Sequence, residues 1–282
     1  DLKISPNQGY TIEKDSSGKI TGIKFTATDN GVNKNTYTIQ YRQKVAQEWG
    51  KKEYTNKAGF KDTDGSGKDV IGKTTVEIGT VEKKLESATD NSDGTKTLNW
   101  KSTAVVPKDG ISANTKITDT LRLSGNESAN HYMTYAQISS WASKIGTAGG
   151  WWKKVGDLHV KDISGNWYNW TDITDQTLKF TSFEYTVKDK IWQTDVADNK
   201  LEFSYSSTMD VSGLSGGDYY FNNVIKIGER SGSSDYNYVK GYVRKTDGNN
   251  RTDTSDITSD GTLVWRVHTY LDKEYNKITV TD

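Results

Sequence analysis

The chain has 282 residues, enough for two domains of ordinary size, and only 32% of them are apolar, so its 16 Tyr and 9 Trp must supply much of any core. Its 37 basic and 37 acidic residues cancel to a net charge of zero, which leaves no electrostatic footprint for nucleic acid or for an anionic membrane surface. The absence of Cys excludes disulfides and thiolate metal sites, and no apolar run is long enough to span a bilayer.

Most of the chain is predicted to form β-strands. Apolar and polar residues alternate in several stretches, as is typical of strands with one buried face; clear examples are 36–41, 201–205 and 263–267. Gly, Asn and Asp provide turn signals between the strands, at 29–31, 92–94, 247–249 and 259–261. The sequence therefore predicts an all-β protein.

One segment in the middle of the chain has a helical pattern instead. Residues 135–145 place Ile138, Trp141, Ala142 and Ile145 on one face of a helix, and Gly146 follows as a stop signal. We expect a single short helix there, inserted between strands.

Three short patterns occur twice along the chain, which indicates an internal repeat. They are a Val-x-Lys strand, an (Ile/Val)-Thr-Asp sequence that follows a Trp-containing strand, and a strand with a central Asn. The two copies are 162, 163 and 167 residues apart, and their key residues are Lys83 and Lys245, Asp119 and Asp282, and Asn223 and Asn56.

These pairs predict three segments. Residues 79–240 hold one complete unit, residues 1–78 hold the late half of such a unit, and residues 241–282 hold the early half. Neither half has enough strands to close a sandwich alone. We expect the halves to complement each other, either within one chain as a circularly permuted domain or between chains as a head-to-tail polymer.

The order Lys83, Asp119, Asn223 resembles the isopeptide-forming, immunoglobulin-like domains of Gram-positive surface adhesins and fimbrial proteins, of the kind found in collagen-binding adhesins. The resemblance rests on Val-x-Lys at 81–83, on Ile-Thr-Asp-Thr-Leu at 117–121 after a Trp strand, on a Tyr-containing penultimate strand and on a final Asn-x-(Ala/Ile) strand. It covers nearly the whole chain. It implies tandem immunoglobulin-like β-sandwiches in which Lys and Asn lie on the first and last strands, with the acid between them in the core.

The resemblance also implies a location and partners. We expect a secreted protein of the cell wall or cell surface with a structural and adhesive role. Its partners would be neighbouring copies of the same repeat and a host extracellular-matrix protein or glycan, and no cofactor is expected.

Elementary chemistry favours the same roles for the three residues. Strand alternation places Lys83 and Asn223 on apolar faces, and burial disfavours the ammonium, so the amine becomes a neutral nucleophile. Burial also favours a protonated Asp119, which can then donate to the Asn carbonyl oxygen. Attack on that carbonyl with loss of ammonia would join the side chains. The reaction happens once within one molecule, so it is autocatalysis and no enzyme activity is expected.

The second set of residues predicts a second bond, between Lys245 and Asn56 with Asp282 as the acid. Taken singly, a Lys at a strand start is more often a solvated edge residue, and an Asp before a loop more often caps a turn. The ordered repetition of all three residue types favours the reactive interpretation.

A Trp-rich insertion offers a rival interpretation. The insertion between Asp119 and Asn223 contains Trp141, Trp151, Trp152, Trp167 and Trp170, and if exposed, Trp151 and Trp152 would suit a ligand-binding adhesin head for collagen or a glycan. The alternative is that these rings pack the helix onto the sheet. A third hypothesis, a glycan-active β-sandwich enzyme, needs a pair of carboxylates about 5–9 Å apart in a cleft, which is a feature of the folded structure and not of one sequence.

The sequence predicts no metal site. His131, His159 and His268 are scattered without ligand spacing, and residues 62–73 begin like a calcium loop but place Lys at its seventh and twelfth positions.

Overall fold

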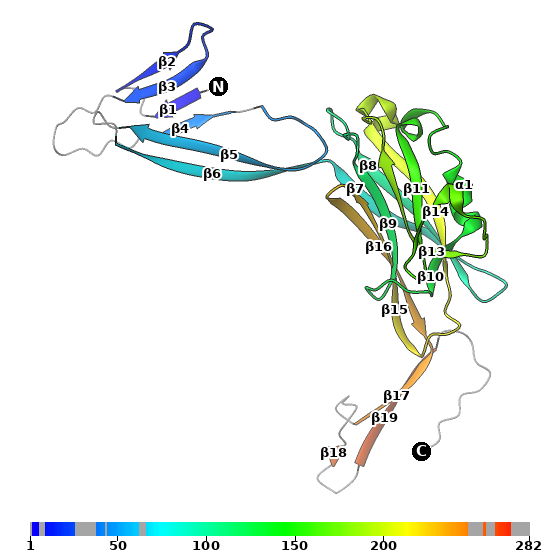
Figure 1. Ribbon diagram of the computed structural model, residues 1–282. Helices are drawn as coiled ribbons and strands as arrows, with labels where there is room; N and C mark the ends of the chain where they lie inside the picture. The colour runs from blue at the N-terminus through cyan, green and yellow to red at the C-terminus, as the bar shows by residue number, and fades with distance from the viewer. Residues whose placement is uncertain are drawn as a thin grey trace. The chain divides into compact units, whose positions relative to one another are not determined.

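The computed structural model describes residues 2–5, 9–25, 38–42, 44–61, 66–247, 256–257 and 263–271. Within this part of the chain the protein is all-β with one α-helix, and every strand pair is antiparallel (Figure 1). The predicted fold class is confirmed. The chain divides into two compact units, residues 1–46 and 47–282.

The first unit contains two short strand pairs. β1 (Leu2–Ser5) pairs with β4 (Thr38–Tyr41), and β2 (Tyr10–Lys14) pairs with β3 (Ile20–Phe25). The carboxylate of Asp15 accepts hydrogen bonds from the backbone of Ser17 and Lys19 at 2.9 and 3.0 Å, which fixes the turn after β2.

The second unit is built on a ten-stranded sheet. Its strands are β7 (Thr80–Asp90), β8 (Lys96–Val105), β9 (Lys116–Leu123), β10 (His131–Thr134), β11 (Val155–Asp162), β12 (Trp167–Asn169), β13 (Lys179–Val187), β14 (Lys200–Met209), β15 (Gly217–Ile227) and β16 (Arg230–Lys240). The strand order is β16-β15-β9-β13-β10-β14-β8-β7, and β11 and β12 extend from β13.

The two ends of this strand order meet. β7 lies against β16 (Figure 1), and the backbone N–H of Leu85 donates to Ser234 Oγ at 3.1 Å. Gly232 on β16 makes this approach possible, because a Cβ there would lie 2.7 Å from the carbonyl oxygen of Val81. The sheet is therefore folded over into two layers that enclose one core, as in a β-sandwich.

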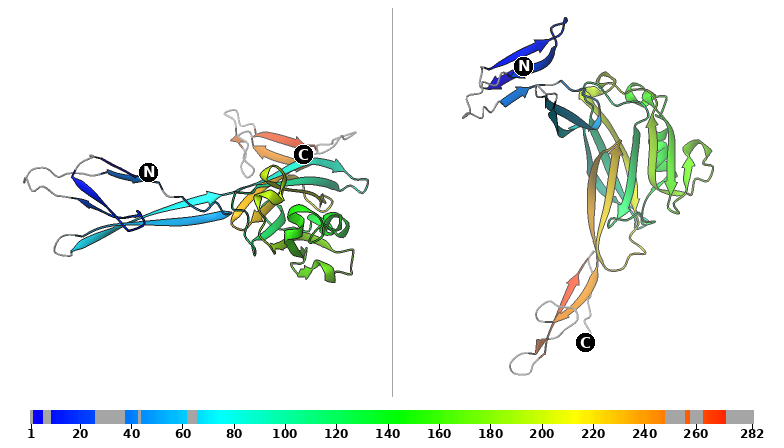
Figure 2. Two further views of the ribbon diagram at one scale, coloured as in Figure 1. Left: turned by 90° about the horizontal axis from the view of Figure 1, so that it is seen from above. Right: turned by 60° about the vertical axis from the view of Figure 1, so that its left-hand side comes forward.

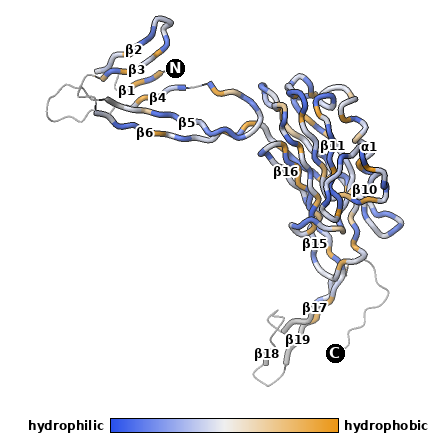
Figure 3. Tube along the Cα trace, in the orientation of Figure 1, coloured by the Kyte–Doolittle hydropathy of each residue, from blue (hydrophilic) through white to orange (hydrophobic). Residues whose placement is uncertain are grey.

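Alternation along the strands builds that core. In β8, every second residue from Leu98 to Ala104 is buried, and apolar and polar positions alternate along the sandwich strands (Figure 3). Large rings fill much of the space, and each removes on the order of 200 Å² from water; the bulkiest fully buried ones are Trp100, Tyr185, Phe180, Phe183 and Phe221. Among the described residues, the buried apolar side chains all lie between positions 98 and 227.

The helix forms where it was predicted but is shorter. α1 (Tyr135–Ala142) starts at a capping box, in which Thr134 and Gln137 bond each other's backbone N–H. It buries Ile138, Trp141 and Ala142 as expected. It ends before Ile145 because the next backbone N–H groups bond three residues back, which tightens the chain before Gly146. The insertion that carries α1 lies to one side of the sandwich, in green in Figure 2.

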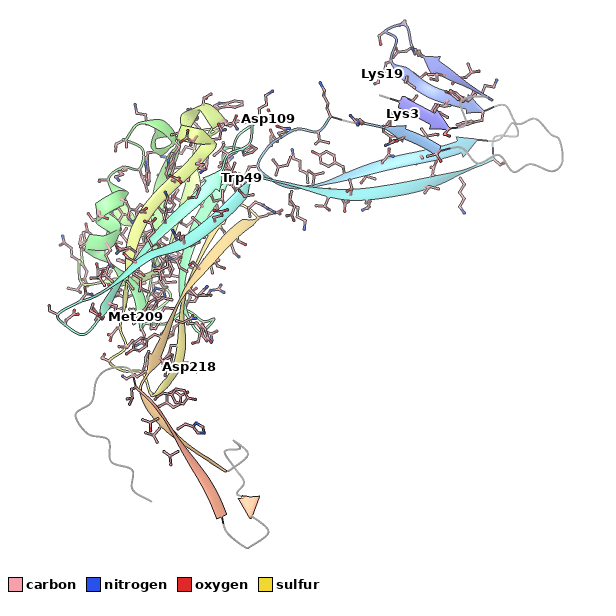
Figure 4. The ribbon with its side chains drawn as sticks, turned by 180° about the vertical axis from the view of Figure 1, so that it is seen from behind. Lys3, Lys19, Trp49, Asp109, Met209 and Asp218 are labelled. Atoms are coloured by element: carbon pink, nitrogen blue, oxygen red, sulfur yellow. The ribbon has the colours of Figure 1, made fainter. Side chains whose placement is uncertain are left out.

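Two strand pairs flank the sandwich in the sequence. β5 (Gly50–Lys61) pairs with β6 (Gly67–Ile78), and β19 (Leu263–Tyr270) pairs with β17 (Tyr242–Asp247) and with β18 (Asp256–Ile257). Trp49, just before β5, donates from its backbone to Gly110 and from its indole to the carbonyl of Ile227, and it lies near Asp109 (Figure 4).

The strand pair β17–β19 repeats the register of β7–β8. Leu85, two residues after Lys83, is opposite Trp100, and Asp247, two residues after Lys245, is opposite Trp265. The connection that precedes each strand pair is also alike, because a single residue, Gly79, joins β6 to β7 and a single residue, Gly241, joins β16 to β17. These matches are a structural parallel to the sequence repeat, and the division into segments 1–78, 79–240 and 241–282 stays a prediction.

Candidate functional site

The structure brings Lys83, Asp119 and Asn223 together inside the sandwich. Lys83 lies on β7, and Asp119 and Asn223 lie on the neighbouring strands β9 and β15. The Lys83 Nζ donates to Asp119 Oδ2 at 2.7 Å, and both side chains are fully buried. Asn223 is also fully buried. Strand alternation places all three on the core side of their strands, as alternation predicted for Lys83 and Asn223 and as the family resemblance implied for Asp119.

Two further residues complete the cluster. Ser102 on β8, opposite Lys83 in the ladder, accepts a hydrogen bond from Lys83 Nζ at 3.0 Å. Tyr205 on β14 accepts another from Nζ at 2.7 Å. The three contacts use every donor of an ammonium group.

The Tyr205 hydroxyl is the centre of the cluster. It donates to Asp119 Oδ1, and it accepts from Lys83 Nζ and from Asn223 Nδ2. One donor and two acceptors are the full capacity of a phenol. Sequence reasoning noticed a Tyr in this strand but assigned no role to Tyr205 or to Ser102. The burial alternation of Leu201, Phe203 and Tyr205 in β14 is the signal that points this hydroxyl into the core.

Burial sets the electrostatics of the pair. Desolvation lowers the pKa of Lys83 to about 8, although the Asp119 carboxylate acts in the opposite direction. Desolvation likewise raises the pKa of Asp119 against the effect of Lys83. Both shifts favour the neutral forms, an amine and a carboxylic acid. The same heavy-atom positions suit either arrangement of the proton, since one hydrogen bond joins Nζ to Oδ2 in both.

The side chain of Asn223 has only part of its hydrogen-bonding capacity satisfied in the described structure. Its Nδ2 donates to Tyr205, but its buried Oδ1 has no hydrogen-bond partner among the residues that the structure describes. A buried polar atom left in this way costs about 1–3 kcal/mol, so the site keeps a carbonyl oxygen with both lone pairs free. That oxygen is where negative charge develops when a nucleophile attacks the amide carbon.

Aromatic rings surround the cluster and exclude water. The Tyr205 ring packs edge-on against Phe183 at 5.3 Å and stacks on Phe203 at 5.8 Å, and Trp141 lies 4.7 Å from Phe183. The arrangement is thus a nucleophile, an acid and an acyl group in a dry pocket of fixed geometry.

The second predicted set is not assembled in the described structure. Asn56 is exposed on β5 opposite Gly72, and Lys245 lies opposite Val267 in a different sheet. Asp282 lies outside the described residues. The second bond therefore stays a prediction.

The two candidate ligand-binding Trp are largely packed. Trp151 is buried and Trp152 is half-buried, their rings stack at 4.0 Å, and both lie against Phe203. The edge of Trp151 still lines a surface cavity of about 290 Å³ beside Asp195 and Lys200. The packing explains why these rings sit where they do, and ligand binding by them stays a prediction.

The described residues contain no group of three His, Asp or Glu placed to hold a metal ion. Residues 62–65 of the calcium-like segment lie outside the described part of the chain. Among the described residues, no helix is long and apolar enough to cross a membrane.

Comparisons with known proteins give distant structural matches. No family model and no curated protein matches the chain. BcpA, the major pilin subunit of Bacillus cereus, matches with a TM-score of 0.27 at 15% identity, over 94% of this chain and 80% of that one. A tetra-tandem repeat from the extending region of a large adhesion protein gives 0.23 at 13% identity, over 95% of this chain and 54% of that one.

A backbone pilin of Streptococcus pyogenes with a modular three-domain structure gives a TM-score of 0.27 at 10% identity, over 89% of this chain and 63% of that one. The chain thus spans less than two thirds of this pilin and of the adhesion repeat. Matches at this level carry no argument about activity, so the proposal below depends on the buried cluster.

Proposed function

We propose that Lys83 and Asn223 form an isopeptide bond inside the sandwich, that Asp119 catalyses its formation, and that the protein is a structural, adhesive shaft of a cell surface. The observation that carries the proposal is the unpartnered Asn223 Oδ1 beside a buried Lys–Asp pair. A core that only needed stability would fill these positions with apolar side chains, because a buried ion pair adds little over a well-packed apolar cluster.

Protonated Asp119 turns from its hydrogen bond with Nζ toward Oδ1, which frees the lone pair of the neutral amine. Lys83 Nζ then attacks the Asn223 Cγ while Asp119 donates its proton to Oδ1, which gives a tetrahedral intermediate. The Cγ–Nδ2 bond then breaks, Nδ2 leaves as ammonia with a proton that came from Nζ, and the proton on oxygen returns to Asp119. One C–N bond forms and one breaks, no oxidant is needed, and Asp119 ends as it began.

The bond would stabilise the domain strongly. It closes a loop from β7 to β15, and by analogy with disulfides the loss of unfolded-state entropy is worth about 5 kcal/mol for a loop of this length. That is comparable to the whole stability of many domains. The three groups act once in the life of the chain, which is autocatalysis.

An intact mass measurement tests the proposal. The wild-type chain should be lighter than its sequence mass by one ammonia for this bond. Lys83→Ala should restore that ammonia, whereas Lys84→Ala, an exposed neighbour on the same strand, should not. A folded wild-type chain with the unmodified mass would eliminate the proposal.

The two faces of the β5–β6 pair differ, which favours a second proposal. We propose that one face belongs to the core of a sandwich whose second layer is supplied by other strands. One face carries the ion pairs Lys51–Glu77, Lys57–Asp69 and Lys73–Glu53. The other carries Asn56 with the apolar residues Tyr54, Ala58, Val70 and Val76, and Val70 is 63% exposed.

The partner that fits this face is an early half-unit of the β17–β19 type, from the same chain or a second copy. Its Lys245 has the strand register of Lys83, which supports a bond to Asn56. Denaturing gels of the purified chain test the source. A ladder of multimers indicates bonds between chains, and a second ammonia lost from a monomer indicates closure within one chain. A monomer without a second loss contradicts this proposal and leaves the first intact.

Location and partners follow from the same proposal. A self-cross-linking shaft needs no cofactor, and its expected neighbours are further copies of the repeat and a host matrix protein or glycan at the cell wall. Surface biotinylation of intact cells that express the full-length protein would test the location.

A further inference from the structure

We propose that Tyr205 is a catalytic residue whose hydroxyl carries a proton from the attacking Lys83 Nζ to the departing Asn223 Nδ2. The proposal rests on the proposed isopeptide reaction and adds a proton path to it. Tyr205 would deliver a proton to Asn223 Nδ2, an atom to which Asp119 is not hydrogen-bonded in the described structure.

The contacts of the two nitrogen atoms carry the argument. The Tyr205 hydroxyl accepts from Lys83 Nζ at 2.7 Å and from Asn223 Nδ2, so it contacts both nitrogen atoms that exchange places in the reaction. Asp119 contacts Nζ and the phenol. Within the described chain, the one hydrogen bond recorded for Nδ2 is the bond to Tyr205.

The chemistry requires a proton at Nδ2. An amide nitrogen leaves as ammonia only after it gains a proton, and attack leaves Nζ with a proton to lose. Each of the two nitrogen atoms is hydrogen-bonded to the Tyr205 oxygen. The Tyr205 O–H first turns from Asp119 toward Nδ2. In one concerted step, Nζ then gives a proton to the Tyr205 oxygen, and the hydroxyl gives its own proton to Nδ2. The Cγ–Nδ2 bond breaks, and Tyr205 is a neutral phenol before and after.

Burial favours a concerted transfer of the two protons over a stepwise transfer through a charged phenolate. Desolvation, with the nearby Asp119 charge, raises the pKa of Tyr205 well above its usual value, so a free phenolate does not accumulate. A hydroxyl that accepts and donates together avoids that charge. The rings of Phe183 and Phe203 hold the phenol in place, and its hydrogen-bonding capacity is already directed at the reacting groups.

Neighbouring hydroxyls cannot replace it. Ser102 accepts from Nζ at 3.0 Å, but no hydrogen bond joins it to Asn223 in the described part of the chain. The Tyr185 hydroxyl is buried and has no hydrogen-bond partner among the described residues. Tyr185 is therefore a matched control, since it has the same side chain and full burial in the same core.

The experiment follows bond formation in time. The full chain is synthesised in a cell-free system, samples are quenched in denaturant, and intact mass gives the fraction that has lost ammonia. Tyr205→Phe keeps the ring and removes the hydroxyl, and it should slow the loss on the order of 100-fold, as expected for removal of a proton-transfer group. Tyr185→Phe should react at the wild-type rate. A wild-type rate in folded Tyr205→Phe would overturn the proposal.

A second variant separates proton transfer from positioning. Site-specific 3-fluorotyrosine at position 205 keeps the hydroxyl and its size but changes its acidity, so a relay predicts an altered rate and an altered solvent deuterium isotope effect. An unchanged rate and isotope effect would assign Tyr205 to positioning only and contradict the relay. A wild-type chain that never loses ammonia would instead contradict the isopeptide reaction, so the two failures are distinguishable.

Discussion

The chain presents the same residue pattern in two environments, and the comparison shows how strongly burial changes the surroundings of the same residue types. In the sandwich, Lys83, Asp119 and Asn223 are fully buried, and burial lowers the Lys83 pKa to about 8. On β5, the corresponding Asn56 is exposed, and the nearby ion pairs are half-exposed. The residue pattern supplies the functional groups, and the enclosing second layer supplies the burial that shifts their pKa values toward the neutral forms.

Removing the acid from each region should give the largest contrast. Asp119→Ala leaves Lys83 buried without its partner, so we expect no ammonia loss and a loss of about 3–5 kcal/mol from the unpaired charge alone. Asp69→Ala on β6 breaks an exposed pair with Lys57 and should change stability by less than about 1 kcal/mol.

Urea unfolding followed by Trp fluorescence, with intact mass alongside, checks both Asp variants. Equal effects of the two substitutions would show that burial does not distinguish the two regions.

A pH series sharpens the same contrast. In the unbonded variant Asn223→Ala, burial should hold the folded pKa of Lys83 below its ordinary 10.5, as in the wild-type structure, where it is about 8. The unfolded chain then binds more protons between these values, so stability should rise with pH from about 8 to 10, by on the order of 3 kcal/mol. Above pH 10 the raised pKa values of Tyr185 and Tyr205 act in the opposite direction.

Thermal unfolding at each pH measures the effect. The double variant Lys83→Met with Asn223→Ala should lose this rise in stability with pH, because the rise requires a buried Lys and the Lys residues of the β5–β6 ion pairs are exposed. A rise of the same size in the double variant would place its cause outside the sandwich site.

Closely matched glycines give the smallest expected effect. Gly232→Ala would push β16 away from Val81, so we expect a loss of about 1–3 kcal/mol and less bond formation, because β7 carries Lys83. Gly72→Ala, opposite Asn56, meets only a backbone oxygen at 3.8 Å and should be nearly neutral. Unfolding midpoints and the bonded fraction by mass check this pair, and a neutral Gly232→Ala would show that β7 and β16 are not tightly packed.

The sequence predicted the parts of this structure that local pattern controls. Period-two alternation predicted the strands and put Lys83 and Asn223 on core faces, whereas the core position of Asp119 was implied by the family resemblance. It did not give the role of Tyr205, because that role depends on the ladder that sets Tyr205 opposite Trp100. The helix end was also missed, since its last turn tightens under packing that no single window of sequence contains.

The single-glycine joins have a consequence for tension along the chain. A pull that enters through β6 passes Gly79 and reaches Lys83 four residues later. With the bond in place, it crosses to Asn223, continues through β15 and β16 and leaves by Gly241 into β17. Everything between residues 83 and 223, including the insertion with α1, lies off this covalent route. If the bond forms as proposed, the insertion carries no tension, so it can vary in sequence, open or carry a ligand without lengthening the covalent path from β6 to β17.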